Sequence, residues 1–345
     1  MTTTEPVVLD AAQEETEGAW GRRLLAANGL WTFAILLVLV AFFSVASPPG
    51  TFLSQYNITQ IATNAAIYLV LGVGMTYVII TGGIDLSIGS VLILSGVLGA
   101  EYVVRHGGYR AAWPAIVVGI LISLGTGTVW GTVQGVLVAK AKVPPFIVTL
   151  GGLGAALGIA QIVTTGNDVA GGAPNALVET LGLGKLFGVV PWLVVVAIAT
   201  TALFGLVLAY TRFGRYTYAV GSNAEAVRRA GIRVDRHLVK VYALAGLLAG
   251  IAGVMSLAFF HTTTIAGHGY DNLNVITAVV MGGTSLFGGR GSIVGTVIGV
   301  FIPAVLGSGL VILGVQTYWQ SVAVGAVLVA AVYVDQLRRR SRERE

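Results

Sequence analysis

The sequence predicts an all-α polytopic membrane protein with about ten transmembrane helices and both termini in the cytoplasm. Charged residues make up 10% of the chain and hydrophobic residues 55%, whereas about 25% of the residues in soluble domains are charged. Most of the uncharged runs exceed the roughly 20 residues that a helix needs to cross the hydrocarbon core. A bilayer offers the backbone no hydrogen-bond partners, so these runs are expected to be helical. The 48 glycines allow the helices to approach one another closely.

Ten spans result when the long uncharged runs are divided where turn-forming residues gather, as at Ser47-Pro48-Pro49-Gly50 and at Gly82-Gly83. The first span follows Arg22 and Arg23, and its apolar stretch is too long for a cleaved signal peptide, which is the alternative interpretation. The eighth span is short, and only a tight turn separates the last two. In chain order, the predicted spans are 24–46, 57–80, 86–104, 113–138, 145–165, 190–210, 239–260, 272–287, 292–313 and 315–334.

The distribution of basic residues orients these spans. With both termini inside, the inner segments hold 17 of the 20 lysines and arginines, and the outer segments hold Arg105, Arg110 and Lys185. An excess of positive charge marks the cytoplasmic side. We therefore predict a disordered acidic cytoplasmic tail (1–23), a single transmembrane domain (24–335) and a basic cytoplasmic tail (336–345). This topology also explains the net charge of +5, which does not indicate nucleic-acid binding.

The most basic interior segment, 212–240, contains a short predicted helix. Ser222 and Glu225 have the S-x-x-E spacing of a capping box, in which two side chains satisfy free backbone N–H groups at a helix start. Gly231 can adopt the left-handed conformation that ends a helix. The pattern predicts a helix over 223–230, which is about 12 Å long at 1.5 Å per residue.

A helix of two turns is too short to be stable alone in water, so it needs a surface to pack on. A solvated loop without a partner is the alternative interpretation. If the helix docks on another protein, its apolar footing is Ala224, Ala226, Val227 and Ala230, and its charge comes from Arg228 and Arg229.

Two glycine-rich segments interrupt the predicted spans, ITGGIDLSIGS at 80–90 and MGGTSLFGGRGS at 281–292. The first holds Asp85, which either caps the next helix, with Ser87 following, or acts as a ligand or gate. Ionisable groups at membrane depth are costly and usually functional. The second holds Thr284, and its GGTSLFGG repeats part of GGIDLSIG at an offset of 200 residues. In so glycine-rich a chain, this is only a weak indication of internal duplication.

Uncharged polar side chains are scattered through the spans. Each is most often a hydrogen-bonding contact between helices, worth about 0.6 kcal/mol. Together, these amides and hydroxyls would suit a neutral hydroxylated solute better than an ion. They are Gln60, Asn64, Gln134, Thr149, Gln161, Asn274 and Gln316.

Motifs of enzymatic chemistry are missing from the sequence. It has no cysteine, no P-loop, no H-E-x-x-H and no G-x-S-x-G. His261 and His268 share one outer loop, which is too little for a metal site. We therefore expect no enzymatic activity and no bound cofactor or metal.

Four segments carry a resemblance to a known family: TGGIDLSIGS (81–90), VPPFIVTLGGL (143–153), AVGSNAEAVRRAGIRV (219–234) and ITAVVMGGTSLFGGRGSIVGTVIG (276–299). Over roughly 55–335, the chain resembles the permease subunits of bacterial ATP-binding-cassette (ABC) importers for sugars, of the ribose/xylose/arabinose type. In such permeases a short cytoplasmic helix with Glu-Ala followed by Gly, the coupling helix, docks in a cleft of a separate ATP-binding subunit. Glu225, Ala226 and Gly231 match that pattern.

The resemblance implies a role and a set of partners. The chain would be a multi-pass permease of the bacterial cytoplasmic (inner) membrane, surrounded by lipid and paired with a second permease copy or paralogue. ATP-binding subunits would lie beneath it and an extracytoplasmic solute-binding protein above it. Residues 211–238 would form the coupling loop, with ATPase-coupling residues Ser222, Glu225, Ala226, Arg228, Arg229 and Gly231. The translocation path or gate would involve Asn64, Asp85, Ser87, Gln134, Asn274 and Thr284.

Two departures from the family pattern leave the identity of the solute undetermined. Gln134 stands where we expect Asn, and Asn272-Leu273-Asn274 precedes ITAVV where acids are usual. An ion-driven secondary transporter is an alternative function, but it would need buried ionisable residues for coupling, and the inner spans offer at most Asp85. A non-transporting membrane scaffold or sensor is a second alternative, although no signalling domain accompanies the spans.

Overall fold

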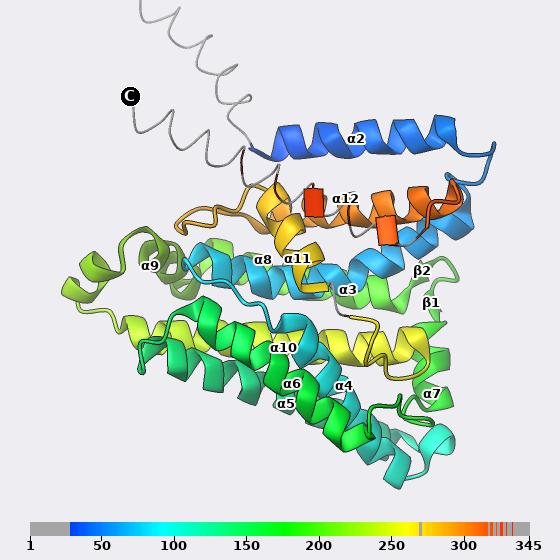
Figure 1. The fold of residues 1–345 in the computed structure, drawn as a ribbon, viewed down its shortest axis with the longest axis horizontal. Coiled ribbons are helices and arrows are strands. Elements are labelled where there is room, and N and C mark those ends of the chain that lie inside the picture. Colours follow the sequence, from blue (N-terminus) through cyan, green and yellow to red (C-terminus); the bar gives the residue numbers. More distant parts are fainter. Residues whose placement is uncertain are drawn as a thin grey trace, which may run out of the picture.

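Helices follow one another along almost the whole of the chain that the computed structural model describes, which is residues 28–268, 271–316, 318, 319, 322, 325, 326, 329 and 333 (Figure 1). The predicted tails 1–23 and 336–345 lie outside the described residues, as does most of the predicted span 315–334. The elements are α2 (Asn28–Ala46), α3 (Gln55–Ile80), α4 (Ile88–Arg105), η1 (Gly108–Arg110), α5 (Trp113–Ala139), α6 (Pro145–Thr164), α7 (Asn175–Leu177), the π-helical turn η2 (Val178–Gly182), β1 (Lys185–Leu186), β2 (Val190–Pro191), α8 (Trp192–Tyr210), α9 (Arg212–Arg229), α10 (Val234–Phe260), α11 (Asp271–Met281) and α12 (Ile293–Ile312).

Seven of these helices are long and apolar enough to cross a membrane: α3, α4, α5, α6, α8, α10 and α12. Two shorter apolar stretches of helix, Trp31–Ala46 within α2 and the whole of α11, stand where the first and eighth spans were predicted. The only strands in the described part of the chain are β1 and β2, of two residues each. The prediction of an all-α polytopic membrane protein is therefore confirmed, and the count of ten spans stays a prediction.

The predicted eighth span, 272–287, differs from the observed helix. α11 has 11 residues, which gives it a length of about 16 Å at 1.5 Å per residue, or roughly half of a 30 Å hydrocarbon core. The helix ends because Gly283 adopts the left-handed conformation, with φ +89°. The N–H groups of Gly283 and Thr284 then bond back to the carbonyls of Val280 and Val279. The rest of the predicted span is an irregular loop.

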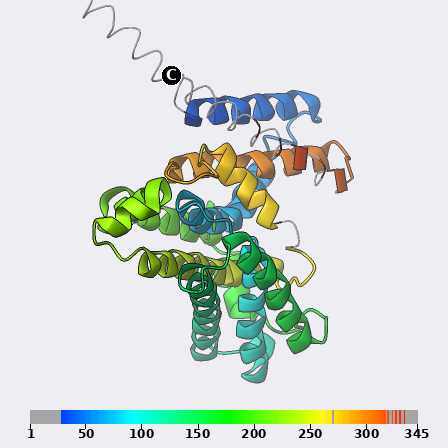
Figure 2. The same ribbon diagram turned by 60° about the vertical axis from the view of Figure 1, so that its left-hand side comes forward.

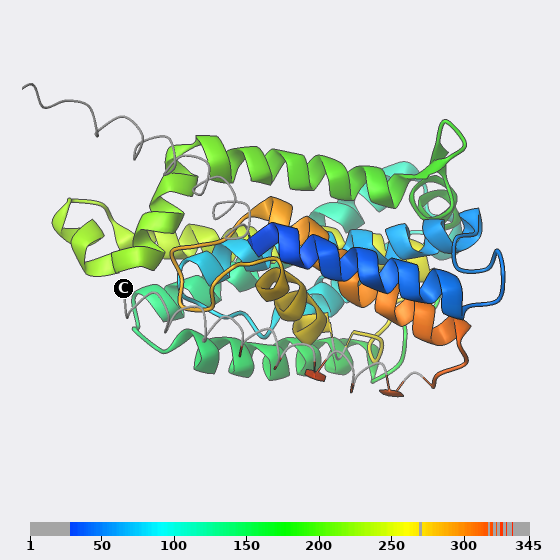
Figure 3. The same ribbon diagram turned by 90° about the horizontal axis from the view of Figure 1, so that it is seen from above.

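α3 and α10 form the centre of the bundle. In the most apolar stretch of α3, 89% of the residues are buried, whereas the corresponding value for α6 and α8 is 22%. α3 packs against α8, α10, α11 and α12, while α2 covers α12 from outside. Figure 3 shows this outer position of α2, in blue, along the orange α12. α6 and α8 therefore present most of their surface to the surroundings of the chain.

Close helix contacts depend on glycine, as the composition led us to expect. α5 and α10 cross where Gly127 and Gly131 of α5 meet Gly246 of α10. A Cβ atom on Gly127 would overlap the carbonyl oxygen of Gly246, and a Cβ atom on Gly131 would overlap that of Tyr242. Only glycine lets the two backbones approach this closely.

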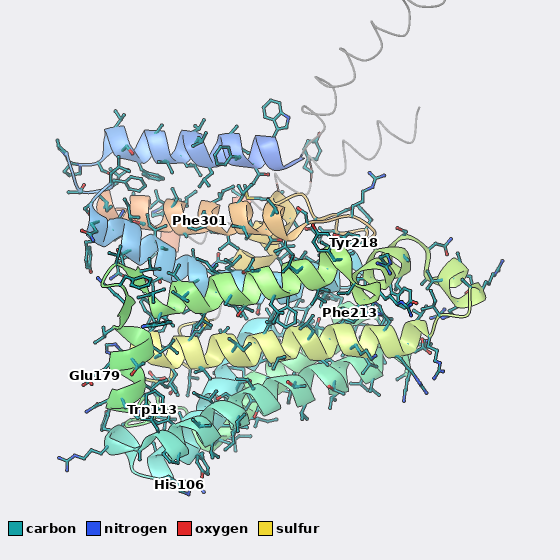
Figure 4. All side chains as sticks on the ribbon, turned by 180° about the vertical axis from the view of Figure 1, so that it is seen from behind. His106, Trp113, Glu179, Phe213, Tyr218 and Phe301 are labelled. Carbon is teal, nitrogen blue, oxygen red and sulfur yellow. The ribbon has the colours of Figure 1, made fainter. Side chains whose placement is uncertain are left out.

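The loops gather at two opposite ends of the bundle. At one end, the α9 end, Lys142 Nζ lies 2.8 Å from Asp235 Oδ1, which joins the α5–α6 turn to the start of α10. At the other, the β1–β2 end, the Val169 N–H bonds to Thr263 Oγ1 at 2.7 Å. Figure 4 shows Tyr218 and Phe213 at the α9 end, and Glu179 and His106 at the opposite end. Segments that the basic-residue count assigned to one side of a membrane thus contact one another.

Candidate functional site

A cavity of ≈ 580 Å³ lies between α3, α11 and α12; apolar residues form much of its lining, and we call it the polar cavity after the polar residues that they surround. It brings together Asn64 and Asn274, two residues of the predicted translocation path that are 210 positions apart in the chain. Ser308 of α12 also lines it and donates a hydrogen bond to Asn57 Oδ1 at 2.7 Å. The polar residues of the lining are Tyr56, Asn57, Gln60, Asn64, Tyr68, Asp271, Asn274 and Ser308.

A second hollow, of ≈ 760 Å³, adjoins this cavity toward the β1–β2 end. The two share Tyr56 and Gln60, and the second is also lined by Thr59 and Thr63 of α3 and by Lys185. The first half of α3 therefore presents amides and hydroxyls to open space on two sides. Amides and hydroxyls both donate and accept hydrogen bonds, so this surface can exchange hydrogen bonds with a neutral polar solute.

Three other predicted path residues form a separate buried cluster near the α9 end. Asp85 Oδ1 accepts hydrogen bonds from the backbone N–H of Ser87 at 2.8 Å and from Ser87 Oγ at 2.6 Å. Gln134 Nε2 of α5 donates to the same Ser87 Oγ at 2.8 Å. All three side chains are at most 3% exposed. The carboxylate therefore shapes the turn before α4 without capping the helix, whose N-cap residue is Ser87, and none of the three lines the polar cavity.

Thr284 lies apart from both groups. It sits in the loop after α11, is 1% exposed, and its hydroxyl has no hydrogen-bond partner among the described residues. A Cβ atom on Gly291 would lie 2.8 Å from Thr284 Oγ1, so this loop is folded tightly on itself. The six predicted path residues thus divide into a cavity pair, a buried trio and one loop residue.

The predicted coupling segment is α9 together with the turn that follows it. Figure 2 shows α9 projecting from the bundle. The helix bends at Asn223, whose φ of −161° and ψ of 92° are extended. Asn223 Oδ1 accepts a hydrogen bond from the Ala226 N–H at 2.9 Å. Asn223 is therefore the N-cap of the second half of α9.

The predicted capping box of Ser222 and Glu225 is wrong. Asn offers the same kind of acceptor as Ser one position later, and it caps the helix. Glu225 instead pairs with Arg229 at 3.3 Å and with Arg228 at 3.8 Å, and all three side chains are exposed. Gly231 has φ +82° and ends the helix as predicted, since its N–H bonds to the Arg228 carbonyl.

The two-turn helix also has a footing of its own, which the sequence interpretation did not foresee. Val227 is 8% exposed and packs with Val220 and Val234 in a small separate core. Val227 is therefore turned inward, whereas Ala226 and Ala230 stay exposed with the arginines. A partner would meet the charged and alanine-lined face of this segment.

α9 rests on the two glycine-rich interruptions, which we call the first break (80–87, beginning with the last residue of α3) and the second break (282–292). The Gly289 N–H donates to the Ile80 carbonyl at 2.8 Å, which joins the breaks directly. Gly221 of α9 packs against both, because a Cβ atom there would overlap the Ile80 oxygen and lie 2.6 Å from the Gly289 nitrogen. Ser222 touches the second break too, since a Cβ atom on Gly289 would lie 2.7 Å from Ser222 Oγ.

Tyr218 fixes α9 to the second break. Its hydroxyl donates a hydrogen bond to the Gly291 carbonyl at 2.8 Å. Burial raises the pKa of the Tyr218 hydroxyl above its ordinary value, so the group stays protonated and remains a donor. A displacement of α9 would therefore move the second break with it.

The sequence interpretation missed a buried carboxylate, and its statement that the inner spans offer at most Asp85 is wrong. Asp271 lines the polar cavity, is 4% exposed, and lies 2.5 Å from His268 Nδ1 through Oδ2. A signal was present, because Asp271 is the one charged residue between Lys240 and Arg290. The same isolation had singled out Asp85.

Comparison with known proteins identifies relatives over most of the chain. Residues 57–332 match the family "Branched-chain amino acid transport system / permease component". The ribose import permease protein RbsC of Escherichia coli (strain K12) is 40% identical over 307 residues, which are 88% of this chain and 92% of the relative. The fructose import permease protein FrcC of Rhizobium meliloti is 35% identical over 320 residues, 89% of this chain and 84% of the relative. The D-allose transport system permease protein AlsC of Escherichia coli (strain K12) is 34% identical over 307 residues, 89% and 91% of the two chains. No solved structure matches.

Proposed function

The chain belongs to the family of branched-chain amino acid transport system / permease components, and on this premise we propose that it is the membrane-spanning subunit of an ATP-driven importer of a sugar or a similar small hydroxylated solute. The resemblance drawn from four segments of the sequence agrees with this membership. As a permease subunit, the chain carries out no bond chemistry, and ATP hydrolysis belongs to a separate chain.

The polar cavity is the observation that supports this solute class. Its lining combines the amides of Gln60, Asn64 and Asn274 with the hydroxyls of Tyr68 and Ser308. Three named relatives are permeases for ribose, fructose and allose, although the family description names branched-chain amino acids. An amino acid carries a carboxylate, and the described lining of this cavity has no lysine or arginine to pair with it, while its one charged residue, Asp271, is itself a carboxylate. A neutral solute fits the lining better.

The second half of α9 is the proposed coupling helix. It exposes Glu225, Ala226, Arg228 and Arg229 at the tip of a projecting segment, with Gly231 at its end. Its base, through Gly221 and Ser222, rests on the two breaks, from which α3, α4, α11 and α12 extend. A push on the tip by an ATP-binding subunit would thus reach four helices of the bundle.

The proposed topology has both termini and the α9 end in the cytoplasm, in a bacterial inner membrane. The positive-inside bias supports it, as does the meeting of the predicted inner loops at one end of the bundle. A second permease copy or paralogue, two ATP-binding subunits at the α9 end and a solute-binding protein at the β1–β2 end complete the proposed assembly.

Transport in this assembly is alternating access. Closure of the ATP-binding subunits moves the coupling helices, and the breaks transmit that movement to the helices that line the polar cavity. Solute released by the binding protein enters from the β1–β2 end. ATP hydrolysis then resets the gate.

The decisive experiment compares two arginines that have the same local setting at opposite ends of the bundle. Arg229 at the α9 end is 80% exposed and pairs with Glu225 at 3.3 Å. Arg105 at the β1–β2 end is 76% exposed and pairs with Glu101 at 3.8 Å. Both pairs have i,i+4 spacing. We expect Arg229→Glu to weaken co-purification of the ATP-binding subunit and to abolish solute-stimulated ATP hydrolysis in liposomes, and Arg105→Glu to change neither.

Val227→Pro provides a stronger test of the same helix. Proline inside a helix costs about 3 kcal/mol or more, because it removes a hydrogen bond and clashes with the preceding turn. The substitution lies outside the membrane-spanning helices, so the bundle should still insert and fold. If this variant retains the ATP-binding subunit and transports normally, then α9 is not the coupling element.

A further inference from the structure

The polar cavity contains a carboxylate among its amides and hydroxyls. Asp271, the first residue of α11, is the one carboxylate among the described residues that line the cavity. It is 4% exposed, and it shares the cavity with Asn64 and Gln60 of α3. A buried carboxylate is costly unless it is hydrogen-bonded. Its surroundings should therefore supply donors.

Two donors hold this carboxylate in place. Tyr68 Oη donates to Asp271 Oδ1 at 3.2 Å, and His268 Nδ1 lies 2.5 Å from Oδ2. The far nitrogen of His268 is in turn fixed by Ser256 Oγ of α10, at 2.8 Å from Nε2. His268 and Ser256 are 5% and 3% exposed. The Tyr68–Asp271–His268–Ser256 chain thus links α3, α11 and α10 and gives the carboxylate one orientation.

The chain of donors leaves Asp271 with unused acceptor capacity. An ionised carboxylate has about four lone-pair sites, and the structure occupies one on each oxygen. Hydrogen bonds to ionised acceptors are roughly twice as strong as neutral ones. A solute that brings two neighbouring hydroxyl groups can donate to both oxygens at once. A site built to bond such groups discriminates strongly against a solute that lacks them.

We propose that Asp271 is the residue that selects polyols in this cavity, by accepting hydrogen bonds from two adjacent hydroxyl groups of a neutral sugar. Asn64 and Asn274 supply the neighbouring amide donors and acceptors, and the ring of Tyr68 supplies an apolar face. This inference rests on the proposed importer function and adds to it the group that recognises the solute. A purely structural role for Asp271 would instead tie α11 to α3 and leave the choice of solute unaffected.

The absence of cysteine from the chain allows the site to be tested directly. Leu306 lines the cavity without taking part in the hydrogen bonds, so Leu306→Cys places a single thiol there. The experiment measures the rate at which a small thiol reagent labels this cysteine in the assembled transporter in nanodiscs. Separate series contain increasing D-ribose, D-fructose, D-allose, 2-deoxy-D-ribose or L-leucine. The sugar concentration that halves the labelling rate reports occupancy of the cavity.

We expect at least one of the three sugars to protect the cysteine, and Asp271→Asn to raise the half-protecting concentration about tenfold or more, as expected for losing a charged hydrogen-bond partner. Asp271→Glu restores the charge and should recover part of the protection. If D-ribose protects the cysteine at a lower concentration than 2-deoxy-D-ribose does, the difference between the two half-protecting concentrations should become smaller in Asp271→Asn. Glu179→Gln is the matched control, because Glu179 is an exposed carboxylate outside the cavity lining, and it should leave protection unchanged.

Three outcomes would overturn the assignment: equal protection of the parent and Asp271→Asn, protection by L-leucine alone, or no protection by any sugar. As a control for folding, the cysteine is also labelled in the absence of solute. If it reacts at the same rate in Asp271→Asn as in the parent, the cavity is still formed. Sugar uptake by the parent complex in proteoliposomes tests the importer function separately. Uptake that continues unchanged in Asp271→Asn would remove this residue from recognition while leaving the importer function intact.

Discussion

The first and second breaks use the same backbone device for different attachments. Each follows a helix that ends with a left-handed glycine, Gly82 with φ +80° and Gly283 with φ +89°. Each then forms a turn in which a side-chain oxygen accepts a hydrogen bond from the backbone N–H two residues later. In the first break, the Ser87 N–H donates to Asp85 Oδ1 at 2.8 Å, and in the second, the Phe287 N–H donates to Ser285 Oγ at 3.4 Å. Asp85 and Ser285 are 200 positions apart, the offset of the sequence repeat.

The attachments of the two breaks differ in burial and in partner. The first break is fixed inside the bundle by the Asp85–Ser87–Gln134 chain and by Thr149 Oγ1 of α6, which donates to the Ile84 carbonyl at 3.0 Å. The second is bonded to α9 by Tyr218. Similar turns thus anchor one pair of helices to the bundle and join the other pair to the projecting segment. What distinguishes the two breaks is therefore the charge and burial of their attachments, since they share the turn geometry.

Gly221→Ala should have the largest effect, because it acts on both breaks at once. The added methyl group would overlap the Ile80 oxygen and crowd the Gly289 nitrogen, and neither backbone atom can move away cheaply. We expect solute uptake and binding of the ATP-binding subunit to fall more than tenfold. Gly158→Ala is the control, since a Cβ atom there meets nothing within 4 Å. Equal uptake by both variants would show that α9 does not rest on the breaks.

Asp85→Ala should have the next largest effect. It leaves the buried N–H and hydroxyl of Ser87 without their acceptor, which costs about 1–3 kcal/mol. Denaturant unfolding of the purified permease in detergent measures this loss. Asp85→Asn keeps an oxygen acceptor in place, so it should be less destabilising, and we expect it to assemble while transporting less. Wild-type uptake by Asp85→Asn would leave this residue with the anchoring role alone.

Tyr218→Phe removes the hydrogen bond that joins α9 to the second break, a loss of about 0.5–1.5 kcal/mol. The expected result is a smaller stimulation of ATP hydrolysis by solute, with the first break unaffected. Tyr216→Phe in the same helix serves as the control, because the ring of Tyr216 contacts the ring of His237, and the variant keeps that ring. A loss of stability without any change in ATPase stimulation would assign Tyr218 a packing role only.

Ser285→Ala should have the smallest effect. The Ser285–Phe287 hydrogen bond is long, at 3.4 Å, and Phe287 is exposed, so the change in unfolding free energy should stay within about 0.5 kcal/mol. Measured beside Asp85→Ala, this variant shows whether the two breaks differ as their burial implies. A loss as large as that of Asp85→Ala would make them energetically equivalent.

Local patterns allowed much of this fold to be predicted. The left-handed glycines Gly82 and Gly231 stand at helix ends, as their sequence context indicated. The N-cap was misplaced because Ser222 and Asn223 are adjacent and both can cap, and only the bend of α9 decides between them. The eighth span was made too long because hydropathy alone does not register the left-handed turn at Gly283.

Long-range contacts could not be predicted in this way. Asn64 and Asn274 were chosen separately, and nothing in either segment indicated a shared cavity. The contact of Ser222 with Gly289 depends on how α9 crosses the breaks, which is a property of the whole bundle. Asp271 was overlooked because it lies at a helix start next to an outer loop, where a carboxylate is usually solvated.

The small core of Val220, Val227 and Val234 bears on whether the segment that contacts the ATP-binding subunit can be exchanged between permeases. All three valines lie within 211–238, so this segment carries its own small core, which includes the first residue of α10. The segment can therefore be exchanged as a unit. Replacing 211–238 by the corresponding stretch of a relative would transfer that relative's preference for an ATP-binding subunit, and the solute that the permease transports would stay the same.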